Sequence, residues 1–138
     1  MLPRDVTDLL PQKKPFKMVD TLIFADAKRI QTSFTIQPDN VLVDDGVFTE
    51  GGMIENMAQS AAAGTGYFFT SQNKEVPIGY IGALKNVQVW HRAQIGDTIE
   101  TELETLHTIG NATIVSGKIF FQKELFASCE LTIFVQEN

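Results

Sequence analysis

The chain has 138 residues and a mass of 15.3 kDa, and 43% of its side chains are hydrophobic, enough for one sizeable core in a single domain over residues 1–138. Its 11 basic and 17 acidic residues give a net charge of −6, which argues against general binding to nucleic acid or an anionic membrane. No apolar run exceeds four residues, so we expect no membrane span, no signal peptide and a cytoplasmic location. One cysteine and two separated histidines predict neither an internal disulfide nor a metal site.

The first 50 residues predict a short helix, two strands and a loop. Asp5 is a candidate helix cap, and Pro11 ends the apolar turn that follows it. Alternation of apolar and polar residues predicts the strands, and a cluster of turn formers predicts the loop. The expected bounds are 5–10 for the helix, 16–25 and 29–36 for the strands with a hairpin at 26–28, and 37–50 for the loop.

A long helix is predicted at residues 51–72, where apolar side chains recur at spacings of three, four and seven. Small residues at 60–66 allow another backbone to approach closely. Two glycines there each cost about 1 kcal/mol relative to alanine, so we expect a packing contact behind them. The rest of the chain predicts four strands, at residues 78–90, 97–109, 112–122 and 125–135, with a two-residue turn at Gly110 and Asn111.

The strand patterns distinguish two faces of a sheet. Every odd position from 125 to 135 is apolar, so Cys129 is expected to be a buried small hydrophobe. Glu100, Glu102 and Glu104 share one face of their strand, as expected for a sheet with one side in water. One long helix between two β segments predicts an α+β fold in which an antiparallel sheet curls around a central helix.

Glu55 is the best candidate for a catalytic group. It lies near the start of the long helix among Met53, Ile54 and Met57, and an acid with apolar neighbours is typical of a functional site. Gln59 lies four residues further on, so its amide shares a helical face with the carboxylate and could orient it. The alternative is a solvated acid stabilised by the helix dipole.

Three stretches resemble β-hydroxyacyl-acyl-carrier-protein dehydratases of the hot-dog fold. Leu9-Leu-Pro-Gln-Lys-Lys-Pro-Phe-Lys-Met-Val-Asp20 is similar to the family's amino-terminal signature, in which Leu-Pro-His precedes Pro-Phe and Val-Asp. Glu55-Asn-Met-Ala-Gln59 matches the family's catalytic acid followed by Ala-Gln on the central helix. The stretch from Gly82-Ala-Leu-Lys to Ile95-Gly-Asp97 is similar to a family segment that ends in Pro-Gly-Asp.

This resemblance implies a hot-dog fold and a 3-hydroxyacyl-[acyl-carrier-protein] dehydratase-like protein of fatty-acid, polyketide or pigment synthesis. It implies Glu55 as the catalytic group and contacts to substrate from Gln12, Gln59, Phe16 and Gly82. No cofactor is expected, because the substrate arrives on the phosphopantetheine of acyl-carrier protein or coenzyme A. Sheets in such proteins pair side by side, which implies a homodimer or a multiple of dimers, or a heterodimer with another hot-dog subunit.

Two departures bear on activity. Gln12 stands where the resemblance implies the family's catalytic histidine, and an amide cannot accept a proton from carbon as imidazole does. The Gly-His-Phe-Pro-Gly segment before the helix is replaced by residues 44–52. The pattern is closer to the histidine-lacking dehydratase-like proteins of flexirubin and aryl-polyene pathways. Glu55 would then act as both base and acid, or a partner subunit would supply the missing group.

Two other functions remain open. One is a catalytically silent subunit that holds the acyl chain. The other is a thioesterase, since such enzymes often carry an acid on this helix after Gly-Gly, but the position that is commonly acidic falls on Gln59.

Three lysines and two histidines are the remaining residues with a possible functional role. Lys13, Lys14 and Lys17 are either solvated or a docking patch for an acidic carrier protein or for the phosphates of coenzyme A. His91 is expected at the surface or in an interface, and His107 at the surface.

Overall fold

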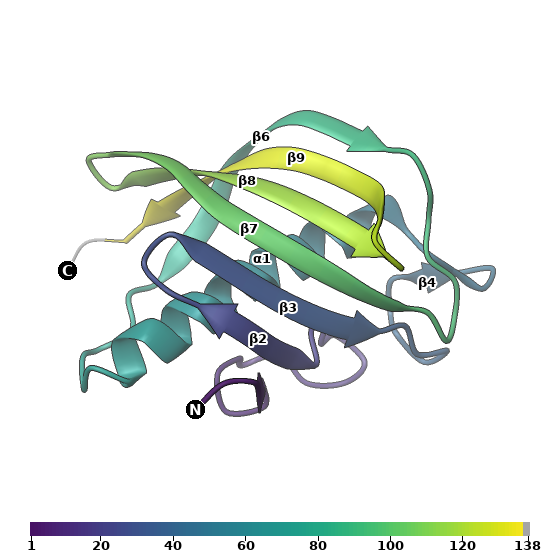
Figure 1. Ribbon diagram of the computed structural model, residues 1–138, viewed down its shortest axis with the longest axis horizontal. Coiled ribbons are helices and arrows are strands. Elements are labelled where there is room, and N and C mark those ends of the chain that lie inside the picture. Colours follow the sequence, from purple (N-terminus) through teal and green to yellow (C-terminus); the bar gives the residue numbers. More distant parts are fainter. Residues whose placement is uncertain (137–138) are drawn as a thin grey trace.

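An antiparallel sheet curves around one long helix in the computed structural model, which describes residues 1–136 (Figure 1). Its strands lie in the order β1-β2-β3-β7-β8-β9-β6, and β4 and β5 form a separate short pair. The strands are β1 (Arg4–Asp5), β2 (Thr21–Ala25), β3 (Arg29–Thr35), β4 (Val43–Asp44), β5 (Val47–Phe48), β6 (Gly79–Val89), β7 (Thr98–Ile109), β8 (Ala112–Phe121) and β9 (Glu124–Val135). The predicted α+β fold is therefore confirmed.

The central helix, α1, spans Glu50–Thr70, and the side chain of Thr49 caps it by accepting from the Gly52 N–H at 3.1 Å. The predicted packing contacts of its two inner glycines exist, and they are made with the same chain. A Cβ on Gly64 would lie 2.4 Å from the Ile30 side chain, and one on Gly66 would lie 3.3 Å from the Leu9 carbonyl oxygen. These glycines let β3 and the amino-terminal loop, which we define as residues 6–20, approach the helix.

The predicted helix over residues 5–10 is wrong. Arg4 and Asp5 pair with β2 instead, and the chain then turns, with the Val6 carbonyl oxygen accepting from the N–H groups of Leu9 (2.8 Å) and Leu10 (3.1 Å). The Asp5 carboxylate accepts from the Thr7 N–H at 2.8 Å, so it stabilises a tight turn rather than a helix.

The predicted strand over residues 16–25 is too long, because only Thr21–Ala25 pairs in the sheet. Immediately before it, side chains of α1 hold the backbone. The Met18 N–H donates to Gln59 Oε1 at 2.7 Å, and the Met18 carbonyl oxygen accepts from Asn56 Nδ2 at 2.7 Å. A residue whose donor and acceptor are satisfied by the helix needs no neighbouring strand.

The remaining predictions agree closely with the structure. Strands β3 and β6 to β9 begin and end within one residue of their expected bounds, and Gly110 and Asn111 form the expected turn. Residues 37–50 are mostly loop but contain the short pair β4 and β5. Cys129 is buried against Met57, with 3.4 Å between their sulfur atoms. In the described part of the chain, no helix is long and apolar enough to cross a membrane.

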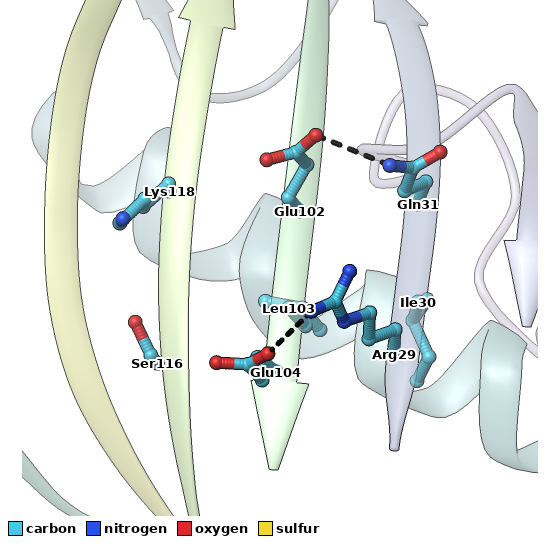
Figure 2. A pocket seen from close by; sticks show the side chains of 8 residues that line it. All are labelled: Arg29, Ile30, Gln31, Glu102, Leu103, Glu104, Ser116 and Lys118. Atoms are coloured by element: carbon cyan, nitrogen blue, oxygen red, sulfur yellow. Dashed lines mark hydrogen bonds and ion pairs between the residues drawn. The ribbon is translucent and has the colours of Figure 1, made fainter. Parts of the chain in front are cut away.

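The sheet face opposite the helix is polar, as the three glutamates predicted. Figure 2 shows Arg29 and Gln31 on β3 beside Glu104 and Glu102 on β7, with α1 behind the strands. Arg29 pairs with Glu104 at 3.2 Å, and Gln31 Nε2 donates to Glu102 at 3.1 Å. These groups line a depression of about 200 Å³ on the outer face. Ion pairs this exposed stabilise little, and we assign this depression no function.

Candidate functional site

A larger cavity, of about 480 Å³, lies between α1, the amino-terminal loop and one end of β6 and β9. It brings together three of the predicted site residues, Gln12, Glu55 and Gln59. Most of the other lining residues are apolar or small: Leu9, Pro11, Ala58, Ala61, Ala62, Thr65, Val76, Pro77, Ile78, Gly79, Tyr80, Ile81, Ile133 and Val135. An apolar cavity with a few convergent polar groups is the usual form of a small-molecule site.

Gln59 is buried and its amide is fully engaged within the chain. Its Nε2 donates to the Phe16 carbonyl oxygen at 3.0 Å and to Glu55 Oε1 at 3.1 Å, while its Oε1 accepts from the Met18 N–H at 2.7 Å. Because a backbone N–H can only donate, it fixes which end of the amide is oxygen. The NH₂ group is therefore directed at Glu55, and Gln59 orients the carboxylate.

Glu55 is half-buried on the second turn of α1 and lines the cavity. One of its oxygens is held by Gln59, and its other oxygen has no hydrogen-bond partner among residues 1–136. An ionised carboxylate has two acceptor oxygens, so the second one is available to a ligand or as a proton acceptor.

Gln12 presents a buried polar atom with no partner. Its amide oxygen is shielded from solvent and accepts no hydrogen bond from any other described residue. A buried acceptor left in this state costs about 1–3 kcal/mol. Gln12 is among the residues that line the cavity, but this oxygen has almost no surface that a ligand there could reach.

Asn56 was not anticipated from the sequence, although it is fully buried beside Glu55. Its Nδ2 donates to the Met18 carbonyl oxygen, and its Oδ1 accepts from the Thr101 hydroxyl. It thus links α1, the segment before β2 and strand β7. The only signal in the sequence was a polar residue one position from an apolar helical stripe, which is too common to identify such a link.

Two predicted substrate contacts lie outside the cavity lining. The side chain of Phe16 is 58% exposed, and its contribution is the carbonyl oxygen that Gln59 binds. Gly82 lies on β6 under the Phe134 ring, where a Cβ would come within 2.3 Å of a ring carbon. Gly82 is therefore small because the Phe134 ring packs directly against it.

The lysines of the predicted docking patch differ in their surroundings. Lys13 and Lys14 are exposed, and Lys13 Nζ donates to the Thr7 carbonyl oxygen at 2.9 Å. The Lys17 side chain is only 13% exposed and pairs with Asp20 at 3.6 Å. Lys17 therefore already has an anionic partner in its own chain.

The two histidines lie away from the cavity. Both are exposed, and neither is among the residues that line the cavity. His91 Nε2 lies 3.1 Å from Glu124, and its ring packs 5.1 Å from that of Phe126.

An antiparallel sheet wrapped around one long helix is the architecture of the hot-dog fold, which the hot-dog dehydratases share. Within this class, residues 4–138 match the model of the ApeP-like family, described as ApeP dehydratase, and the chain belongs to that family.

The chain is also similar to individual proteins of known sequence or structure. The chain is 26% identical over 146 aligned positions to the 3-hydroxyacyl-[acyl-carrier-protein] dehydratase FabZ of Campylobacter lari, with 96% of each protein covered. Among solved structures, it resembles a chain of the dehydratase heterocomplex ApeI:P from Xenorhabdus doucetiae, with a TM-score of 0.85, 17% identity, and 98% and 93% of the two chains covered. It also resembles a hypothetical thioesterase with coenzyme A from Streptococcus pneumoniae, with a TM-score of 0.68, 11% identity and 85% of each chain covered. At these identities, the two structural likenesses support the fold alone.

Proposed function

We propose that this protein binds acyl thioesters carried on phosphopantetheine and dehydrates 3-hydroxyacyl thioesters. The observation that carries the proposal is Glu55, held by Gln59 at the side of an apolar cavity with one carboxylate oxygen available. The apolar lining suits an alkyl or polyene chain, and the family supports the dehydratase class.

The reaction needs a base and an acid. The base removes a proton from C2, the C2–C3 double bond forms, the C3–O bond breaks, and the departing hydroxyl takes up a proton to leave as water. Gln12 cannot carry a proton at neutral pH, so Glu55 accepts the C2 proton and returns it to the hydroxyl. A single carboxyl that serves both steps reaches one face of the substrate only, so we expect slow syn elimination.

Mass spectrometry of a 3-hydroxyacyl-carrier substrate tests the proposal through loss of one water. We expect turnover by the parent and none by Glu55→Gln, which keeps the shape and removes proton transfer. Glu102→Gln, on the outer face, is the matched control and should behave as the parent. Gln12→His should raise the rate. Parent turnover that survives Glu55→Gln would contradict the role of Glu55, and release of free carrier thiol would indicate a thioesterase instead.

The second candidate is a catalytically silent subunit that completes a heterodimer. The observation that favours it is the absence of an imidazole from the described residues that line the cavity, together with the likeness to one chain of a dehydratase heterocomplex. A companion hot-dog gene that retains Leu-Pro-His would favour this candidate. If neither the parent nor Gln12→His turns over alone, while a mixture with that companion does, the silent-subunit hypothesis is the better one.

For either candidate, we propose that a second subunit adds to the edge strand β6. Among the described residues, β6 pairs only with β9, and most of its 11 residues are exposed. Apolar side chains are exposed on it and just beyond its ends: Val76, Ile78, Tyr80, Leu84, Val87 and Trp90. Long apolar edges are normally covered, so we expect a dimer or a multiple of dimers. A light-scattering mass near 15.3 kDa at micromolar concentration would contradict this expectation.

Carrier docking is proposed at Lys13, Lys14 and Lys17. At an exposed rim, each lysine should contribute roughly 0.2–1 kcal/mol and act mainly on the association rate. Since Lys17 is paired with Asp20, we expect Lys13→Glu and Lys14→Glu to weaken binding to an acidic carrier more than Lys17→Glu does. Equal affinity of the parent and the triple variant for the carrier, at low and at high salt, would exclude this surface.

A further inference from the structure

Two side-chain amides of α1 hold a single residue of the amino-terminal loop. The Met18 N–H donates to Gln59 Oε1 at 2.7 Å, and the Met18 carbonyl oxygen accepts from Asn56 Nδ2 at 2.7 Å. Positions 56 and 59 are three residues apart, so they lie on one face of the helix. Because Met18 is buried, water does not replace either bond. The backbone of Met18 is therefore fixed at both its donor and its acceptor by one turn of α1.

The orientation of Glu55 depends on this backbone. Gln59 directs its NH₂ group at Glu55 because its oxygen is occupied by the Met18 N–H. The Phe16 carbonyl oxygen accepts from the same NH₂ group at 3.0 Å and fixes the amide in the same sense. A displacement of Met18 away from α1 thus removes one of the two backbone contacts that keep the Gln59 oxygen turned away from the carboxylate.

Asn56 is itself oriented from the sheet. Its Oδ1 accepts from the Thr101 hydroxyl of β7, which leaves its NH₂ group for the Met18 carbonyl oxygen. Asn56 is fully buried and is not among the residues that line the cavity. Among the hydrogen bonds of the described residues, its side chain is connected to Glu55 only through Met18 and Gln59.

We propose that Asn56 positions Glu55 for proton transfer by holding the backbone of Met18. The proposal rests on the proposed function, because it assumes that Glu55 moves a proton. Without Asn56, the Met18 carbonyl oxygen is buried with no donor, and the loop shifts to bring it to water. The Met18 N–H then leaves the Gln59 oxygen, and the amide turns. Glu55 thereby loses the orientation that proton transfer requires.

A second buried polar contact of α1 provides a matched control. The hydroxyl oxygens of Thr32 on β3 and Ser60 on α1 lie 2.7 Å apart, and both residues are fully buried. Neither side chain forms a hydrogen bond to residues 16–18 or to Glu55. Thr32→Val keeps the shape of the side chain and removes this contact. It should therefore lower stability without changing the orientation of Glu55.

Steady-state kinetics with a 3-hydroxyacyl-carrier substrate separate positioning from stability. Asn56→Leu keeps a similar shape and removes the amide. We expect its kcat to fall about 10-fold while KM stays within about 2-fold of the parent value, because Asn56 does not line the cavity. Thr32→Val should keep the kcat and KM of the parent, although the melting temperatures of both variants fall.

NMR spectroscopy tests the same series of contacts without turnover. The signals to follow are those of the Gln59 side-chain NH₂ group, after their assignment in the parent. In Asn56→Leu we expect them to move toward the positions of a solvent-exposed glutamine. In Thr32→Val they should stay in place, because that contact does not reach Gln59.

Three results would overturn the proposal: Gln59 signals that do not move in Asn56→Leu, an unchanged kcat of Asn56→Leu in a parent that turns over, or equal losses of kcat in Asn56→Leu and Thr32→Val. Asn56→Ala replaces Asn56→Leu should that variant not fold. If the parent does not turn over, the proposed function fails, while the Gln59 signals still support or overturn the role of Asn56. Turnover by the parent with unmoved signals overturns that role and leaves the proposed function intact.

Discussion

Replacing Gln59 by leucine should destabilise the fold through the segment before β2. Leucine has a similar volume, but it makes none of the three hydrogen bonds of the amide. Met18 is 1% exposed, so its N–H would be left buried without an acceptor, at a cost of about 1–3 kcal/mol. The part-buried carbonyl of Phe16 adds about 0.5–1.5 kcal/mol. We expect a loss of roughly 2–4 kcal/mol in the free energy of unfolding.

Thermal unfolding measures this loss. An unfolding entropy of about 2.1 cal/mol/K per residue, applied to 138 residues, makes 1 kcal/mol equivalent to about 3.5 °C, so the melting temperature should fall by about 7–14 °C. Gln31→Leu is the matched control, since this glutamine makes one bond, to Glu102 on the polar face, and should lower the melting temperature by no more than about 2 °C. Equal shifts for the two variants would refute the assignment of Gln59 as a link between the helix and this segment.

Two further predictions concern neighbouring glycines and the single thiol. In urea unfolding, Gly51→Ala should raise the free energy of unfolding by up to about 1 kcal/mol, because the nearest atom to its new Cβ is 3.9 Å away. Gly52→Ala should lower it by about 1–3 kcal/mol, because that Cβ would lie 2.5 Å from the buried Phe48 ring. Equal effects of the two variants would contradict this packing. Burial, aided by the nearby Glu130 carboxylate, raises the pKa of Cys129 from 9.0 to about 11. The contribution of this thiol to stability is therefore complete below pH 9 and is lost as the pH rises through 11. The parent should lose more stability over this range than Cys129→Ala, and parallel losses would refute a raised thiol pKa.

The sequence was sufficient for the elements that repeat a simple pattern. The long helix and the five longest strands follow from the spacing of apolar residues, and their side chains need no information from elsewhere in the chain. The main errors fall between residues 4 and 20, and the short pair β4 and β5 was also missed; in both places local and distant contacts compete. Whether Arg4 and Asp5 form a strand depends on β2 being available beside them, and a single sequence does not contain that information.

The site could be predicted in part for the same reason. Glu55 and Gln59 are one helical turn apart, so their contact follows from helix geometry. Gln12 joins them in the cavity only because the amino-terminal loop packs against α1, and the resemblance, rather than any spacing, suggested it. Asn56 and Thr101 are 45 residues apart, and nothing local to either one indicates their hydrogen bond.

The fold and the candidate site depend on one another through Gln59. Its oxygen holds the backbone of Met18 in place of a neighbouring strand, and its NH₂ group orients Glu55. The contacts on the loop side are to backbone atoms of Phe16 and Met18, so they place little demand on which side chains stand there. An amide of this length is required at position 59, because glutamate has no N–H for Glu55 and asparagine is one methylene shorter. A glutamate at position 59, as in the thioesterase pattern, has no N–H to donate to the Phe16 carbonyl oxygen or to Glu55, and it would place two carboxylates side by side. The orientation of Glu55 seen here therefore requires glutamine at position 59.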